Sequence, residues 1–311
     1  MNYRKPILVT GTHRSGSTWV GKMISFSPDV GYIHEPFNPN HRRGVLDIRW
    51  DYWFKSVRPE ETEKYLPAFE KMLTFQYDLM KDLLRTESFN PKYIHYRLQD
   101  KKRFAQYRKD NVRPLIKDPL AFFSTEWLAK TFDMDVIITI RHPAAFASSL
   151  VRLEWDIDFR EFLKQPHLMD SDLQPYKDQI FDFTNNHYSR IEQACLYWNI
   201  VYSIVLRWMK NHDNWLFVTH ESLSADYLNG FRQIYKYLNL EYSEDVARKI
   251  DLYCNADNKD FEVKKVTEKH KLNSAKNIKS WKKRLSDDQV KIIRETTCEI
   301  ADQFYGEEYW E

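Results

Sequence analysis

The sequence predicts an α/β fold in which a parallel sheet is flanked by helices and the C-terminal half is mainly helical. Short apolar runs typical of buried strands alternate along the chain with helical patterns. Parallel strands need crossover connections, which helices usually provide. All twelve prolines lie at or before Pro175, and the chain beyond it contains only two glycines, so few helix breakers remain there.

The opening unit of this fold is a strand, a glycine-containing turn and a helix, expected at residues 6–10, 11–17 and 18–26. Three later apolar runs are also expected to be strands: residues 113–117, 135–140 and 215–219. Helical patterns lie between these runs: residues 122–132, 143–153 and 187–209. The last helix is expected to begin at Ser286, which forms a capping-box pattern with Gln289.

Two stretches fit the alternation of strands and helices poorly, residues 38–113 and 155–186. They are polar, aromatic and partly helical in pattern. We expect them to be insertions that shape a binding site, within a single domain that spans residues 1–311.

The composition is typical of a globular protein from a reducing compartment. The chain has 311 residues, of which 42% are hydrophobic and 30% charged. The net charge of +2 provides no basic field for nucleic acid, so no such partner is expected. The three cysteines are far apart and form no Cys-x-x-Cys pair. With no signal-peptide pattern and no apolar stretch of membrane-spanning length, we expect a cytoplasmic protein; composition leaves its oligomeric state open.

Glycine is scarce, and five of the seven glycines lie within the first 44 residues. Gly11 and Gly16 frame a turn between a strand and a helix, the arrangement of a P-loop-like phosphate site. Backbone N–H groups of such a loop converge on an anion, and the helix N-terminus adds a partial positive charge. Arg14 adds a cation. Three hydroxyl groups can add hydrogen-bond donors: Ser15, Ser17 and Thr18.

The loop lacks two features of a site for a nucleoside triphosphate and magnesium. A Walker A loop would carry lysine at the position of Ser17, where it reaches the terminal phosphates. The strand at residues 135–140 is followed by Arg141 and not by an aspartate that would help to hold magnesium. We therefore expect an anion site without a metal. A P-loop kinase or another nucleotide-binding phosphotransferase is the alternative.

Two segments resemble the donor-binding motifs of sulfotransferases. Residues 12–19 resemble the loop that binds the 5′-phosphosulfate of 3′-phosphoadenosine 5′-phosphosulfate (PAPS). Residues 138–149 resemble the 3′-phosphate motif, in which an arginine at a strand end and a serine eight residues later hold that phosphate. The resemblance implies PAPS as donor and adenosine 3′,5′-bisphosphate (PAP) as product. It implies these donor contacts: Thr12, His13, Arg14, Ser15, Gly16, Ser17, Thr18, Trp19, Arg141 and Ser149. Whether Trp19 packs against adenine or fills the core stays open.

Glu35 is the first candidate for the base that takes the proton of the acceptor. The Glu35-Pro36 segment resembles the Glu-Pro segment of carbohydrate sulfotransferases and some prokaryotic ones, where the glutamate faces the acceptor. Asp118 is the alternative base, or a structural anchor. His34 is a weaker option for the same role.

Lys117 matches a lysine that contacts the sulfuryl group in the cytosolic branch of the family. That branch has its histidine base two residues later, where this chain has Pro119. This departure favours Glu35 as the base. The resemblance thus implies three catalytic residues: Glu35, Lys117 and Arg14.

Residues 264–284 carry nine lysines or arginines and one acidic residue. Their position resembles the C-terminal loop that closes over the donor in the family, which implies Ser274 and Lys276 as further donor contacts. A non-enzymatic role for this run, in binding anions or nucleic acid, is the alternative.

The resemblance implies transfer of the sulfuryl group of PAPS to a hydroxyl acceptor on a carbohydrate or glycolipid. Aromatic residues, which make up 15% of the chain, suit sugars, steroids and phenols alike. A small lipid, steroid or phenolic acceptor is therefore the alternative to a glycan.

Overall fold

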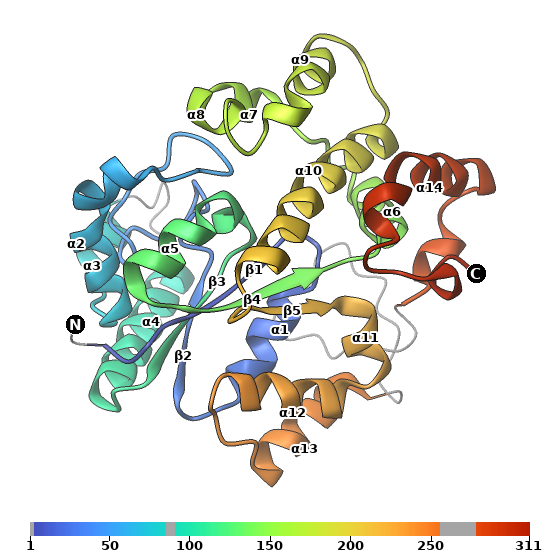
Figure 1. Ribbon diagram of the computed structural model, residues 1–311. Coiled ribbons are helices and arrows are strands. Elements are labelled where there is room, and N and C mark those ends of the chain that lie inside the picture. Colours follow the sequence, from blue (N-terminus) through green and yellow to red (C-terminus); the bar gives the residue numbers. More distant parts are fainter. Residues whose placement is uncertain (1–2, 85–90, 256–277) are drawn as a thin grey trace. The chain divides into compact units, whose positions relative to one another are not determined.

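The computed structural model describes residues 3–84, 91–255 and 278–311 (Figure 1). The chain divides into two compact units. The first consists of Met1–Thr10 and Val20–Val136, and the second of Gly11–Trp19 and Ile137–Glu311. The turn predicted between the first strand and the first helix therefore belongs to the second unit, although it interrupts the first in sequence.

The fold is α/β, as predicted, with a five-stranded sheet in the order β2-β3-β1-β4-β5. The strands are β1 (Ile7–Gly11), β2 (Val30–His34), β3 (Arg113–Lys117), β4 (Asp135–Ile140) and β5 (Leu216–Thr219). The pairs β1–β3, β2–β3 and β4–β5 are parallel. In the register of the first unit, Lys117 lies opposite both Val9 and His34. The residues that follow β2 and β3 therefore meet at the carboxyl ends of neighbouring strands.

Four of these five strands lie where the sequence predicts them, and β2 is the strand that it misses. Only three of the five β2 residues are buried, and Gly31 lowers its strand propensity, so no continuous apolar run marks it. The glycine has a packing role: a Cβ atom there would lie 2.4 Å from the Phe75 ring. β2 matters for function because Glu35 follows its last residue directly.

In the first unit, helices account for most of the chain between the strands. These elements are α2 (Thr62–Leu73), α3 (Leu79–Leu83), α4 (Pro91–Lys109), α5 (Thr125–Phe132) and the short 3-10 turns η1 (Pro59–Glu61) and η2 (Pro119–Ser124). The helix predicted at residues 122–132 is the end of η2 followed by α5. Helix α1 (Ser17–Ile24) begins in the second unit and ends in the first.

The second unit is mainly helical. Its elements are α6 (Pro143–Leu153), α7 (Arg160–Leu163), α8 (Pro166–Met169), η3 (Gln174–Tyr176), α9 (Lys177–Asn185), α10 (Arg190–Asn211), α11 (His220–Ala225), α12 (Tyr227–Tyr237), α13 (Glu244–Cys254), η5 (Ser280–Lys283), α14 (Asp287–Ala301) and η6 (Glu307–Tyr309). Helices α6, α10 and α14 pack against one another. The capping box predicted at Ser286 and Gln289 is confirmed.

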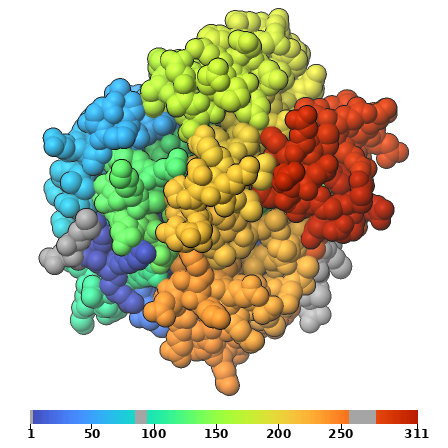
Figure 2. All heavy atoms as spheres, viewed as in Figure 1, coloured from blue at the N-terminus to red at the C-terminus, as the bar shows by residue number. Residues whose placement is uncertain are grey.

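Helix α10 forms the centre of this unit. Ser189 caps it with a second capping box, and twelve of its side chains are buried. Two of the largest are Trp198 and Tyr202, both fully buried. The segment that precedes it, residues 156–186, forms part of the surface of this unit (yellow-green in Figure 2).

Candidate functional site

The loop between β1 and α1 is a tight turn that requires both of its glycines. Gly11 and Gly16 have φ angles of 146° and 100°. A Cβ atom on Gly11 would lie 2.3 Å from the Thr139 carbonyl oxygen, and one on Gly16 would lie 2.7 Å from the His220 ring. The Ser15 N–H and hydroxyl both donate to the Thr12 carbonyl, at 3.1 and 2.6 Å. The loop therefore has one compact conformation that leads directly into a helix N-terminus.

Arg14 adopts a left-handed backbone conformation in this loop, with φ of 69°. Its Nε atom donates to Ser149 Oγ at 3.0 Å. Burial, together with the charges of Arg152 and Arg141, lowers the pKa of Arg14 to about 10. Arg14 of the loop thus contacts Ser149 of the segment 138–149. The mutual repulsion of the three guanidinium groups would be relieved by an anion among them.

Arg141 follows β4 and is held by a buried carboxylate. Its Nε atom lies 3.4 Å from Glu221 Oε1. The same carboxylate accepts the His142 backbone N–H at 3.2 Å and the Tyr305 hydroxyl at 2.9 Å. Burial raises the pKa of Glu221, while Arg141 opposes that shift. Glu221 therefore orients Arg141 and, through Tyr305, ties it to the C-terminal part of the unit.

The other aromatic and imidazole side chains of this region are largely enclosed. Trp19 is 5% exposed; its Nε1–H donates to Cys254 Sγ at 3.2 Å, and its ring lies 5.3 Å from that of Phe231. The His13 ring lies 5.1 Å from that of Tyr197. Ser17 is buried and Thr18 half-buried, while Ser274 and Lys276 lie outside the described residues.

His142 is buried inside an aromatic cage. Its ring centroid lies 5.6 Å from Trp281, 4.9 Å from Tyr305 and 4.4 Å from Trp310. Burial, with a smaller contribution from Arg141, lowers the pKa of His142 to about 3. Its imidazole is therefore neutral at physiological pH. The structure describes residues 278–284 of the predicted basic segment, and Trp281 within them contacts His142.

In the first unit, Glu35 and Lys117 form an ion pair at the ends of β2 and β3. Lys117 Nζ lies 2.5 Å from Glu35 Oε1, and its side chain is fully buried. The Glu35 N–H donates to the Lys117 carbonyl at 2.9 Å. Glu35 has a left-handed φ of 43°, an uncommon conformation for a glutamate. Backbone and side chain thus both hold Glu35 next to Lys117.

Two opposing effects set the protonation state of Glu35. Burial by itself would raise the pKa of this carboxyl group, but the charges of Lys117 and His34 and the hydrogen bonds from Lys117 and Asn38 lower it below its usual value. Glu35 is therefore a carboxylate at neutral pH. The exposed His34 ring lies 3.9 Å from Glu35 Oε2, further away than Lys117.

Asp118 is fully buried, and both of its oxygens accept backbone hydrogen bonds. Oδ2 accepts the Phe37 N–H at 2.6 Å, and Oδ1 accepts the Leu120 N–H at 2.8 Å. Burial, reinforced by the charge of Glu35, raises the pKa of Asp118 to about 7. These contacts tie the segment that follows Glu35 to the end of β3.

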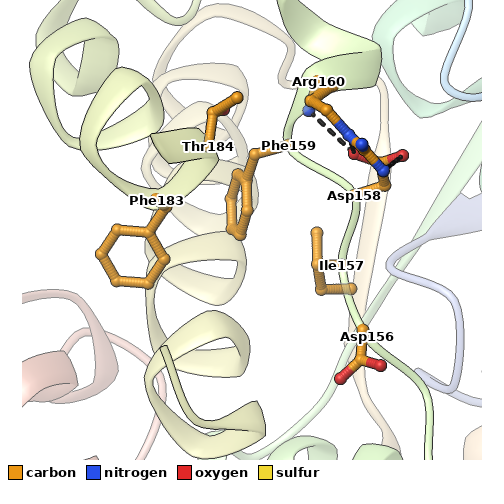
Figure 3. A pocket seen from close by; sticks show the side chains of 7 residues that line it. All are labelled: Asp156, Ile157, Asp158, Phe159, Arg160, Phe183 and Thr184. Atoms are coloured by element: carbon orange, nitrogen blue, oxygen red, sulfur yellow. Dashed lines mark hydrogen bonds and ion pairs between the residues drawn. The ribbon is translucent and has the colours of Figure 1, made fainter. Parts of the chain in front are cut away.

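A cavity of about 240 Å³ lies within the segment predicted as the second insertion (Figure 3). Asp158 and Arg160 form an ion pair of 2.7 Å on one side, and Phe183 and Thr184 lie on the other. Its lining therefore combines aromatic rings with paired charges.

Three side chains that contact or surround the arginines of this region were not predicted as site residues: Arg152, Tyr202 and Glu221. Arg152 follows Ser149 by three residues on α6, so helical spacing puts both on one face. Tyr202 lies within the apolar pattern of α10, and its hydroxyl carries no sequence signal. Glu221 lies two residues after β5, and this position near a strand end is the sequence signal that could have marked it as a site residue.

A model of the sulfotransferase family matches residues 6–244. Among curated proteins, no relative matches the chain. The sulfotransferase domain of the Synechococcus PCC 7002 olefin synthase aligns with a TM-score of 0.49 and 17% identity, covering 98% of this chain and 96% of that one. The sulfotransferase domain from the curacin biosynthetic pathway aligns with a TM-score of 0.48 and 12% identity, covering 95% of this chain and 98% of that one. A mouse sulfotransferase complexed with PAP aligns with a TM-score of 0.43 and 12% identity, covering 97% of this chain and 85% of that one.

Proposed function

The chain belongs to the sulfotransferase family, and on that premise we propose that it transfers the sulfuryl group of PAPS to a hydroxyl group of a carbohydrate or glycolipid. One observation carries the donor part of this proposal: the Arg14–Ser149 hydrogen bond of 3.0 Å, which joins two anion-binding motifs that lie far apart in the sequence. PAPS has an anionic group at each of two ribose positions, so a donor site needs cations for both.

In the proposed donor site, the amides of the loop and Arg14 hold the 5′-phosphosulfate, and Arg141 and Ser149 hold the 3′-phosphate. The clustered positive charge supports this assignment, since burial and two neighbouring arginines lower the pKa of Arg14 to about 10. A bound dianion would favour the charged form of each arginine. The buried carboxylate of Glu221 keeps Arg141 oriented without a ligand.

In the proposed chemical step, Glu35 takes the proton of the acceptor hydroxyl. The acceptor oxygen forms a bond to sulfur, and the bond from sulfur to the phosphate oxygen of the donor breaks, so that PAP leaves. Lys117 neutralises the sulfuryl oxygens. The ion pair of 2.5 Å makes Glu35 a weak base until Lys117 turns to another anion. The sulfuryl group would be that anion, so donor binding would activate the base.

The base assignment is tested with Glu35→Gln, which keeps the shape of the side chain and removes its basicity. We expect turnover to fall at least about 100-fold, the usual contribution of a general base, while PAP affinity changes less than about threefold. Glu63→Gln, at an exposed position of α2, is the matched control and should keep full activity. Turnover is measured by the mass gain of one sulfonate on a panel of glycans and glycolipids, with phenols and steroids alongside.

Each contrary result identifies a different error. Activity of Glu35→Gln within about tenfold of wild type would remove Glu35 as the base. Sulfation of phenols or steroids alone would show that the acceptor is a phenol or steroid and not a carbohydrate or glycolipid. Tighter binding of ATP with Mg²⁺ than of PAP would favour a kinase.

A further inference from the structure

Tyr202 connects the two anion-binding motifs of the second unit. Its hydroxyl oxygen accepts the Arg141 backbone N–H at 2.9 Å and lies 3.1 Å from Thr12 Oγ1. Either hydroxyl can donate in the bond between Tyr202 and Thr12, since a hydroxyl that accepts the Arg141 N–H can still donate its own proton or accept a second one. The side chain is fully buried in α10, so water does not compete for these bonds.

The same helix holds Arg141 from its other side. Trp198, about one turn before Tyr202, donates its Nε1–H to the Arg141 carbonyl oxygen at 2.9 Å. Both polar groups of the Arg141 backbone are thus bonded to side chains of α10. Thr12 opens the phosphate loop, and its carbonyl accepts the Ser15 bonds that close that turn. Helix α10 therefore bonds to one residue of each motif, Thr12 and Arg141.

We propose that Tyr202 is a positioning residue that sets the separation of the two phosphate sites, so that the protein selects a ligand carrying both phosphates over a ligand carrying either one. This inference rests on the proposed donor. A ligand with two anionic groups gains from its second contact only where the spacing of the two sites matches its own. A monophosphate occupies one site at a time and is indifferent to that spacing.

The test compares PAP, adenosine 5′-monophosphate and adenosine 3′-monophosphate by isothermal titration calorimetry. Tyr202→Phe removes the hydroxyl, and Thr12→Val removes its partner with little change in shape. We expect each variant to weaken PAP binding at least about tenfold and to leave each monophosphate within about threefold of wild type. Tyr176→Phe is the matched control, because it removes a tyrosine hydrogen bond of 3.2 Å to the backbone of the same helix at Asn199. It should leave all three affinities unchanged.

The double variant sharpens the result. If the Tyr202–Thr12 bond carries the effect, Thr12→Val should weaken PAP binding no further when Tyr202→Phe is already present. Equal loss of affinity for all three ligands would reduce Tyr202 to a structural role and overturn the inference. Unchanged PAP affinity in Thr12→Val would also overturn it. Wild-type protein that binds PAP no more tightly than adenosine 5′-monophosphate would instead refute the proposed donor, and the selectivity with it.

Discussion

Two neighbouring carboxyl groups of the first unit, Glu35 and Asp118, have pKa values shifted in opposite directions. Lys117 offsets the burial of Glu35, so the pKa of that group lies below its usual value. Asp118 is more deeply buried and lies near the negative charge of Glu35, so its pKa is raised to about 7. Only one of them has a cationic partner at 2.5 Å. This difference allows a pH profile to tell which group acts as the base.

The pH dependence of kcat/KM reports the ionisation of the free enzyme. If Glu35 is the base, kcat/KM should stay constant from about pH 8 down to about pH 5.5, because a group with a lowered pKa remains a carboxylate there. If Asp118 is the base, kcat/KM should fall as the pH drops below about 7. A steady-state profile with PAPS and one acceptor decides between them. Lys117→Met removes the charge that lowers the pKa of Glu35, so that pKa should rise. The fall of kcat/KM at acid pH should therefore begin at a higher pH in this variant than in wild type.

At the scale of elements, the loop proposed to bind phosphate depends on glycine for both conformation and space. Gly16→Ala would put a Cβ atom 2.7 Å from the His220 ring at a φ of 100°. We expect PAP affinity to fall at least about tenfold and the free energy of unfolding to fall by about 1–3 kcal/mol. Calorimetric titration and urea denaturation measure the two effects.

Gly230→Ala is the control for this substitution. It makes the same change on α12 in the same unit, where the added methyl group meets the end of a flexible leucine side chain. PAP affinity should be unchanged there. A Gly16→Ala protein that binds PAP like wild type would show that the loop tolerates another conformation and does not form the phosphate site as proposed.

Elements with a strong local pattern were predictable, and β2 shows where that pattern ends. The strands at 113–117 and 135–140 contain the apolar or β-branched runs 114–116 and 136–140, and their bounds agree with the prediction. β2 contains a glycine, a half-buried tyrosine and an exposed histidine. Its pairing with β3 over five residues stabilises it, and that pairing has no local signature.

At the scale of the whole molecule, the two units have different proposed roles. The loop, Arg141, Ser149 and Tyr202 belong to the second unit, and Glu35, Lys117 and Asp118 belong to the first. No helix within residues 3–84, 91–255 and 278–311 combines the length and the hydrophobicity needed to cross a bilayer.

This division predicts where PAP should protect the backbone from hydrogen exchange. PAP carries both phosphates but no sulfuryl group, so it should slow exchange at residues 11–19 and 138–149 and have little effect at residues 30–38. Hydrogen-exchange mass spectrometry with saturating PAP measures this pattern, and Arg14→Ala should remove the protection. Protection limited to residues 30–38 would contradict the assigned donor site.

The sequence alone determined the features that act over short distances. The loop glycines, the spacing of Arg141 and Ser149, the capping box at Ser286 and four of five strands are local patterns of backbone conformation and hydrophobicity. Tertiary structure alone decided which of these meet. The Arg14–Ser149 bond spans 135 residues and the Thr12–Tyr202 bond spans 190. Asp118 contacts Phe37 across 81 residues. Such contacts form because distant elements pack together, and a polar atom at the end of an apolar side chain leaves no periodic signal in the sequence.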